Sequence, residues 1–224
     1  MVKELHLFII WNNARFMEKQ ILNDIKKKFE IFQIYEISWS EEDFAKNLAR
    51  FYGKKLPKSC KKEKEVGFGP FLAVLIHDNH PRITNNKNYN VASTKQSYRR
   101  LLGKNLIHAS DTSDEAAENI LFLLGKSIKE IETEEPFLSP RPIVRDIPGN
   151  HFWNSIDEAL TLVKKIPFTK TVAYKESFLI HSHHADIVRR ILNASPCRFK
   201  IPGRHKYYVK IGKNKQPVYI RKVH

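Results

Sequence analysis

The nine residues Gly103–Asp111 (GKNLIHASD) bring together side chains that are suited to phosphate chemistry. His108 ends a short apolar run that predicts a buried strand, and a strand end holds the backbone of the histidine in place. A histidine that accepts a phosphoryl group must be neutral and held in one tautomer, with its other nitrogen aimed in line at the phosphorus. Asn105 can hydrogen-bond substrate oxygens, and Ser110 adds a hydroxyl nearby. The stretch predicts a candidate phosphoryl-acceptor site.

The elements that must position this site alternate between strand and helix patterns. Residues 5–11 (LHLFIIW) form a continuous apolar run, which is typical of a strand buried on both faces. Thr112–Glu115 matches a capping box, and the helix that it opens is expected to stop at Gly125. The other expected elements are strands at 31–39, 71–77 and 105–108, helices at 14–29, 40–51 and 93–102, and loops at 53–66 and 78–91. This order predicts an α+β sandwich of the ferredoxin-like type.

The chain is expected to divide into a domain at 1–131, a proline-rich linker at 132–149 and a small basic α+β module at 150–224. Four prolines between 136 and 148 mark the linker. In the module we expect helices at 156–163 and 185–192, a strand at 171–174 and a hairpin that joins 207–211 to 218–220.

Composition limits the possible classes of protein. No apolar run approaches the ~20 residues that span a bilayer, and the N-terminus does not have the pattern of a signal peptide. Cys60 and Cys197 form no metal-binding spacing and no disulfide framework, which favours the cytoplasm. The net charge of +15 is compatible with nucleotide, nucleic acid, anionic lipid or glycan partners, and equally with a lysine-rich solvated surface.

Gly103–Asp111 and the helix after it resemble nucleoside diphosphate kinases, which carry G-R-N-I-I-H-G-S-D before a similar helix. Gly69-Pro70 resembles the S-G-P segment of that family, and Ser40-Glu41-Glu42 stands where its second helix opens. The resemblance spans about residues 4–125. It implies a nucleoside diphosphate kinase-like fold and a transferase that binds ATP or a similar nucleoside di- or triphosphate with Mg²⁺. It also implies a phosphohistidine at His108 and a homo-oligomer.

The resemblance also assigns roles to individual residues. Lys95 falls where the family has a phosphate-contacting arginine, Lys104 replaces the arginine of the motif, and Asn119 falls where a glutamate orients the histidine. Arg99 and Arg100 are further candidate phosphate ligands on the helix of Lys95. The candidate nucleotide and phosphate ligands are Asn105, Lys95, Lys104, Arg82, Arg99, Arg100 and Ser110. No residue is expected to bind a metal directly.

Two departures from the family pattern concern catalysis. The family's catalytic lysine has no counterpart in Trp11-Asn12-Asn13-Ala14, and Asn119 brings no charge to stabilise an imidazolium. Each change removes roughly a few kcal/mol of transition-state stabilisation. A second hypothesis is therefore a module that keeps the nucleotide site without its chemistry.

Other features leave further alternatives open. Phrases such as IIWNNAR and FWNSIDEAL resemble bacterial surface-polysaccharide proteins, which join such a domain to a nucleotidyltransferase-like one. The acid pair of that superfamily is missing, because Asp186 stands alone. The segment 181–186 (HSHHAD) permits a metal site, although surface histidines are the simpler interpretation. A third hypothesis is a nucleic-acid-binding accessory protein, in which Tyr207 and Tyr208 stack on bases.

Overall fold

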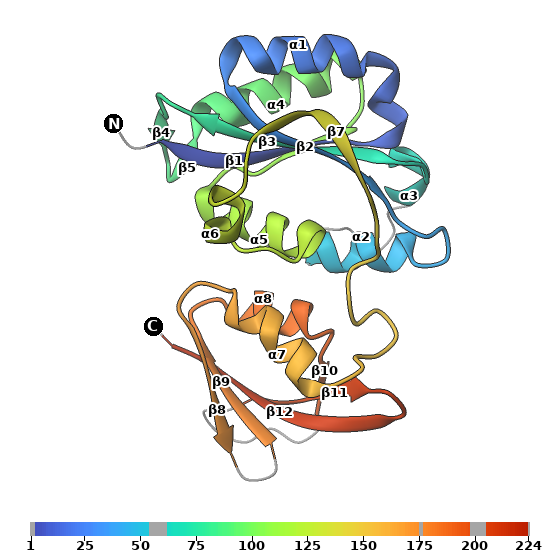
Figure 1. Ribbon diagram of the computed structural model, residues 1–224, viewed down its shortest axis with the longest axis vertical. Helices are drawn as coiled ribbons and strands as arrows, with labels where there is room; N and C mark the ends of the chain where they lie inside the picture. Colours follow the sequence, from blue (N-terminus) through green and yellow to red (C-terminus); the bar gives the residue numbers. More distant parts are fainter. Residues whose placement is uncertain (1–2, 54–61, 175–176, 198–204, 224) are drawn as a thin grey trace.

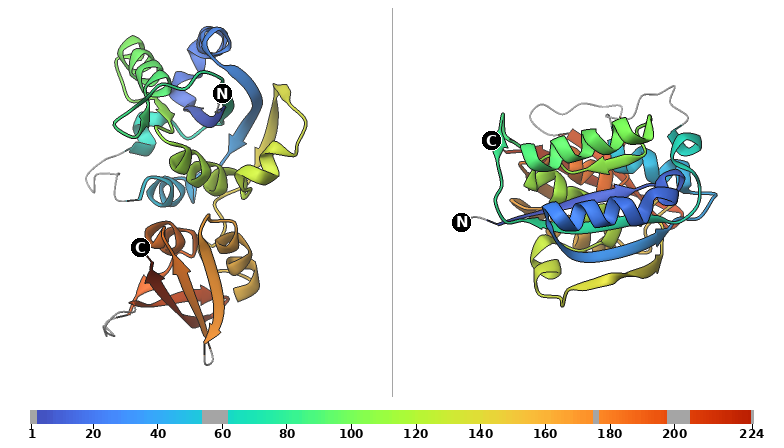
Figure 2. Two further views of the ribbon diagram at one scale, coloured as in Figure 1. Left: turned by 90° about the vertical axis from the view of Figure 1, so that its left-hand side faces the viewer. Right: turned by 90° about the horizontal axis from the view of Figure 1, so that it is seen from above.

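The computed structural model describes residues 3–53, 62–174, 177–197 and 205–223. It is an α+β protein with two five-stranded sheets (Figure 1). The N-terminal sheet has the strand order β6-β1-β3-β2-β7, and the C-terminal sheet has the order β10-β11-β12-β9-β8. Helices cover both faces of the first sheet and the face of the second that is turned toward it (Figures 1 and 2).

The N-terminal sheet is antiparallel except at its last strand, β7, which pairs parallel with β2. Its strands are β1 (Glu4–Ile10), β2 (Glu30–Ser38), β3 (Phe71–Asp78), β6 (Ile107–Ala109) and β7 (Phe137–Val144). The associated helices are a 3₁₀ helix η1 (Asn12–Met17), α1 (Glu18–Lys28), α2 (Phe44–Tyr52), α3 (Lys62–Val66), α4 (Tyr89–Leu102), α5 (Ser113–Leu124) and α6 (Ile128–Glu132).

The central strands are largely apolar because helices cover both faces of the sheet. Along β1, Phe8 and Ile10 pack in a core with α1 and α4, whereas Leu7 and Ile9 pack in a second core with α2 and α5. Thr112 caps α5, since its side chain accepts a hydrogen bond from the backbone of Glu115, while the Glu115 carboxylate accepts one from the backbone of Asp111. These packing and capping patterns explain why the main strands and helices of this half were predictable.

Three segments differ from the expected ones. The expected loop 53–66 contains α3 in its described part, and the expected loop 78–91 contains a small hairpin, β4 (Ile83–Thr84) and β5 (Lys87–Asn88). The Asn88 side chain caps α4, so this helix begins at Tyr89 rather than at 93. The expected linker 132–149 contains β7, because proline is tolerated in an edge strand.

The C-terminal sheet packs its helices against the N-terminal half. Its elements are α7 (Ile156–Lys164), β8 (Thr169–Tyr174), β9 (Ser177–Ser182), α8 (Ala185–Ile191), β10 (Ser195–Pro196), β11 (His205–Ile211) and β12 (Asn214–Lys222). β9 was not expected, and β12 begins earlier than expected. Trp153, Leu160 and Val188 belong to the same core as α2 and α5, so one core continues through both halves. Among the described residues, no helix is long and apolar enough to cross a membrane.

Candidate functional site

His108 is the middle residue of β6 and lies opposite Ile9 of β1. It is 7% exposed, and its ring lies between two aromatic side chains of α2. The ring centroids of Phe51 and Tyr52 are 5.4 and 5.5 Å from that of His108, with the planes nearly perpendicular. The sequence pattern did not predict these neighbours, since they come from a helix more than fifty residues away. The imidazole is thus fixed in an aromatic enclosure.

Asn119 of α5 holds the imidazole at its second nitrogen. The Nδ2 atom of Asn119 lies 2.8 Å from Nε2 of His108, and Asn119 is itself buried. Because an amide NH₂ group only donates, Nε2 accepts this hydrogen bond and carries no proton. The ring proton then belongs to Nδ1. The structure therefore places the Asn119 amide against the imidazole, and this orientation of the amide corresponds to the Nδ1–H tautomer.

Tyr52 adds a polar group to this enclosure that the sequence analysis missed. Its hydroxyl accepts a hydrogen bond of 3.2 Å from Nε1 of Trp11 at the end of β1. Burial raises the pKa of Tyr52 above its usual value, the nearby charges of Glu65 and Glu115 add to this, and Arg99 opposes it. The hydroxyl therefore stays protonated near neutral pH, within electrostatic reach of one cation and two acids.

Two of the predicted phosphate ligands are engaged by the protein itself. Lys95 is buried, forms an ion pair with Asp111 and donates a 3.2 Å hydrogen bond to the carbonyl of Ala109. Arg99 donates through Nε to the carbonyl of Ile107 at 2.9 Å. Both side chains thus bind the backbone of β6, and part of their donor capacity supports the strand that carries His108.

Lys62 of α3 is a further cation near the motif, and the sequence analysis placed it in an undifferentiated loop. Its Nζ atom donates to the carbonyl of Asn105 at 2.8 Å and lies 2.9 Å from a carboxylate oxygen of Glu65. The other carboxylate oxygen of Glu65 accepts a hydrogen bond from the backbone of Asn105. α3 therefore clamps the turn that precedes β6, while Asn105 itself is exposed.

The remaining predicted ligands are distributed over other surroundings. Ser110 is fully buried, and its hydroxyl accepts a hydrogen bond of 3.0 Å from the backbone of Leu7, so it ties β6 to β1. Arg82 is exposed beside β4, with its guanidinium 5.0 Å from the ring centre of Tyr89. Lys104 and Arg100 are also exposed, in the turn after α4 and on its last turn. Within the predicted set, the Asn119 side chain hydrogen-bonds to the histidine.

The turn after β1, where the resembled family has its lysine, contains a pair of amide side chains. Asn12 donates to the carbonyl of Pro70 at 3.2 Å, and Asn13 donates to that of Glu65 at 2.8 Å. A Cβ atom added at Gly69 would come within 2.3 Å of the Asn12 amide, so a side chain there would displace that amide. The two asparagines thus fasten the turn to the loop before β3.

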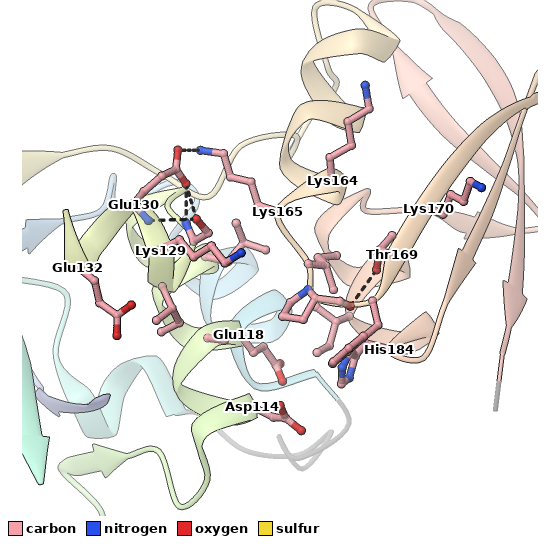
Figure 3. A pocket seen from close by; sticks show the side chains of 18 residues that line it. Asp114, Glu118, Lys129, Glu130, Glu132, Lys164, Lys165, Thr169, Lys170 and His184 are labelled. Atoms are coloured by element: carbon pink, nitrogen blue, oxygen red, sulfur yellow. Dashed lines mark hydrogen bonds and ion pairs between the residues drawn. The ribbon is translucent and has the colours of Figure 1, made fainter. Parts of the chain in front are cut away.

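A cavity of about 950 Å³ lies apart from His108, between α5 and α6 on one side and α7, β8 and α8 on the other (Figure 3). Its lining mixes acids with cations, and Lys165 reaches across it to Glu130 at 2.7 Å. Leu121 and Phe168 are among its apolar lining residues. The mixed charge of this lining gives the cavity no preference for an anion or a cation.

In the described part of the chain, the histidines and Asp186 of segment 181–186 do not come together as a group of three possible metal ligands. Asp186 pairs with Arg189 and Arg190, and the ring of His183 packs on Phe168. Within the described ranges, three ligand atoms come together at Glu42, Asp43 and His151, where Asp43 already binds Lys46 and His151. These ion pairs account for the cluster without a metal.

Among solved structures, the chain is similar to a nucleoside diphosphate kinase of Aquifex aeolicus in an orthorhombic C222 crystal form. It is 20% identical, with a TM-score of 0.39, and the match covers 55% of this chain and 96% of that chain. No protein-family model and no curated protein matches the sequence. The resemblance to surface-polysaccharide proteins finds no support and stays a prediction.

Proposed function

We propose that residues 1–131 form a nucleotide-binding domain of the nucleoside diphosphate kinase-like, ferredoxin-like type, which recognises phosphate beside His108 without accepting a phosphoryl group. The observation that carries this proposal is the hydrogen bond from Asn119 to Nε2 of His108. Nucleotide recognition is supported by the cations around the motif, Lys62 and Arg99. Mg²⁺ would arrive with the nucleotide, held by its phosphates.

The hydrogen bond from Asn119 argues against phosphoryl transfer because it determines which ring nitrogen of His108 has a free lone pair. Phosphoryl transfer to an imidazole forms a nitrogen–phosphorus bond from a lone pair, while the bond from phosphorus to the bridging oxygen breaks. With the amide nitrogen of Asn119 toward the ring, the Nε2 lone pair of His108 accepts a hydrogen bond from that amide, and the ring proton is on Nδ1. A carboxylate at position 119 would instead accept Nε2–H and leave the lone pair on Nδ1. The amide at position 119 thus favours nucleotide recognition over phosphoryl transfer.

The test compares labelling by γ-labelled ATP and Mg²⁺ in wild type, Asn119→Glu and Asn119→Gln, with ATP binding measured by calorimetry. We expect wild type to bind ATP and to stay unlabelled. Asn119→Glu is expected to acquire an acid-labile, base-stable label that disappears when His108→Ala is added. Asn119→Gln keeps the amide and serves as the matched control, so it is expected to stay unlabelled.

Two results would contradict the proposal in different ways. A label in wild type that depends on His108 would show that the histidine is a phosphoryl carrier, which is the first hypothesis from the sequence. A wild-type protein that binds neither ATP nor ADP would end the nucleotide interpretation altogether. The second result would leave the fold assignment untouched.

A further inference from the structure

Among the described residues, no helix covers one face of the C-terminal sheet. α7 and α8 lie on the side toward the N-terminal half, so the opposite side is turned away from the rest of the protein (Figure 1). Along the strands, Val209, Val218 and Ile180 point into the core. Side chains at alternate positions point to the opposite side because strand residues alternate. We call that side the outer face.

Three tyrosines lie on the outer face. Tyr208 is on β11, Tyr219 on β12 and Tyr174 on β8, and all are half-buried. The ring centroids of Tyr174 and Tyr219 are 5.3 Å apart. Nζ of Lys206 lies 5.4 Å from the ring centre of Tyr208 and 6.0 Å from that of Tyr219. The outer face thus carries aromatic rings on three strands, with an ammonium group beside two of them.

The charge of the outer face is positive. Lys206 is joined there by four exposed cations, Lys170, Lys210, Lys215 and Arg221, and register places each on the tyrosine side of the sheet. None of the five forms an ion pair with an acidic residue in the described part of the chain. Residues 150–224 contain fifteen Lys and Arg against four Asp and Glu, so this half carries most of the net charge of +15.

We propose that the outer face binds single-stranded nucleic acid, with bases stacked on the tyrosine rings and phosphates held by the five cations. Aromatic rings on an open sheet can stack on the faces of unpaired bases. In a duplex, those faces are stacked on neighbouring base pairs and are not accessible. The cations match the phosphate backbone, since charge complementarity dominates the affinity of such interfaces. No residue of the His108 site takes part, so this proposal stands or falls separately from nucleotide recognition.

The test measures fluorescence anisotropy of labelled oligo(dT) and oligo(U), each about 12 nucleotides long, with the full chain. We expect Tyr208→Ala and Tyr219→Ala each to raise the Kd by about fivefold or more, since stacking on one ring is worth about that much. Tyr208→Phe keeps the ring and is expected to bind like wild type. If four cations meet phosphates, a plot of log affinity against log salt has a slope of about −3.

Matched controls come from the N-terminal half. Tyr89→Ala removes an exposed ring and Lys19→Ala an exposed cation elsewhere, and neither is expected to change the Kd. Circular dichroism checks that each variant is folded. If a tyrosine variant is unfolded, the exposed pair Lys210→Ala and Lys215→Ala replaces it and is expected to weaken binding and flatten the salt slope. Equal binding of duplex and single strand, or tyrosine and lysine variants that bind like wild type, would overturn the proposal.

Discussion

Arg50 is the side chain whose removal should most weaken the connection between the two halves. It lies on α2 and is 8% exposed. Its guanidinium donates hydrogen bonds to the carbonyl oxygens of Ile147 and Pro148 at 3.2 and 2.7 Å. It also donates to those of Arg190 and Ile191 at 3.2 and 2.7 Å. The carbonyl of Arg190 also accepts the backbone N–H of Asn193, so the three acceptors that rely on Arg50 are the carbonyls of Ile147, Pro148 and Ile191.

The magnitude follows from two opposing contributions. Arg50→Met leaves those acceptors without their donor, at a cost of about 1–3 kcal/mol for each that stays buried. The charged group itself is costly to bury: desolvation, with the nearby charge of Arg190, lowers the pKa of Arg50 to about 10. Losing that cost returns roughly 3 kcal/mol. We therefore expect Arg50→Met to lower the free energy of unfolding by about 3 kcal/mol, with some acceptors regaining water.

Urea denaturation monitored by tryptophan fluorescence measures this loss, since Trp11 reports on the N-terminal half and Trp153 on the C-terminal half. Arg189→Met is the matched control. Arg189 pairs with Asp186 at 3.0 Å on the surface, so its loss is expected to cost less than about 1 kcal/mol. The reasoning is refuted if Arg50→Met loses no more stability than Arg189→Met.

Three smaller predictions concern individual contacts. Hydrogen bonds from Lys165 and the backbone lower the pKa of Glu130 to about 2, below its usual 4.5. The ionised Glu130 carboxylate therefore stabilises the folded state above pH 4.5, and this contribution is lost as the pH falls toward 2. Because Glu130 is exposed, Glu130→Gln should cost less than about 1 kcal/mol at neutral pH and nothing at pH 2, as thermal melts at both values would show. Tyr52→Phe removes the acceptor of the indole N–H, so urea titration should find a loss of about 1–2 kcal/mol, and no loss would contradict the contact. Lys95→Met leaves the carboxylate of Asp111 without its main partner and should lower the free energy of unfolding by about 2–3 kcal/mol. Adding Asp111→Asn should restore part of that loss in a double-mutant cycle, and additive losses from the two substitutions would contradict the pairing.

The parts of the fold that depend on local patterns were predictable from the sequence. The runs at Leu5–Trp11 and Phe71–His77 are apolar except at His6 and His77, and the structure has β1 and β3 there. Thr112 and Gly125 mark the two ends of α5 through capping and a left-handed backbone. Such signals lie within a few residues of the element that they define, so they need no knowledge of tertiary structure.

The segments that were missed depend on distant partners. β9 is too short to display a pattern of its own, and it becomes a strand because β8 and β12 pair with it on both sides. In the site, a motif comparison was enough to place Asn119 beside His108. The pairing of Lys95 with Asp111 and the contact of Tyr52 with the imidazole arise from packing between separate elements. No spacing rule in a single sequence predicts such contacts.

The proline-rich strand β7 also determines how the N-terminal sheet ends. It covers the edge of β2 from Gln33 to Ser38, which would otherwise offer unpaired backbone groups to another chain. Pro140 and Pro142 fall at alternate positions of β7. Because proline has no N–H group, the free edge of β7 lacks two of the hydrogen-bond donors that a further strand would need for pairing. The same stretch that separates the halves along the chain thus acts as a barrier against self-association. Dividing the protein before β7 would remove that barrier, whereas dividing it after Asp146 would preserve it.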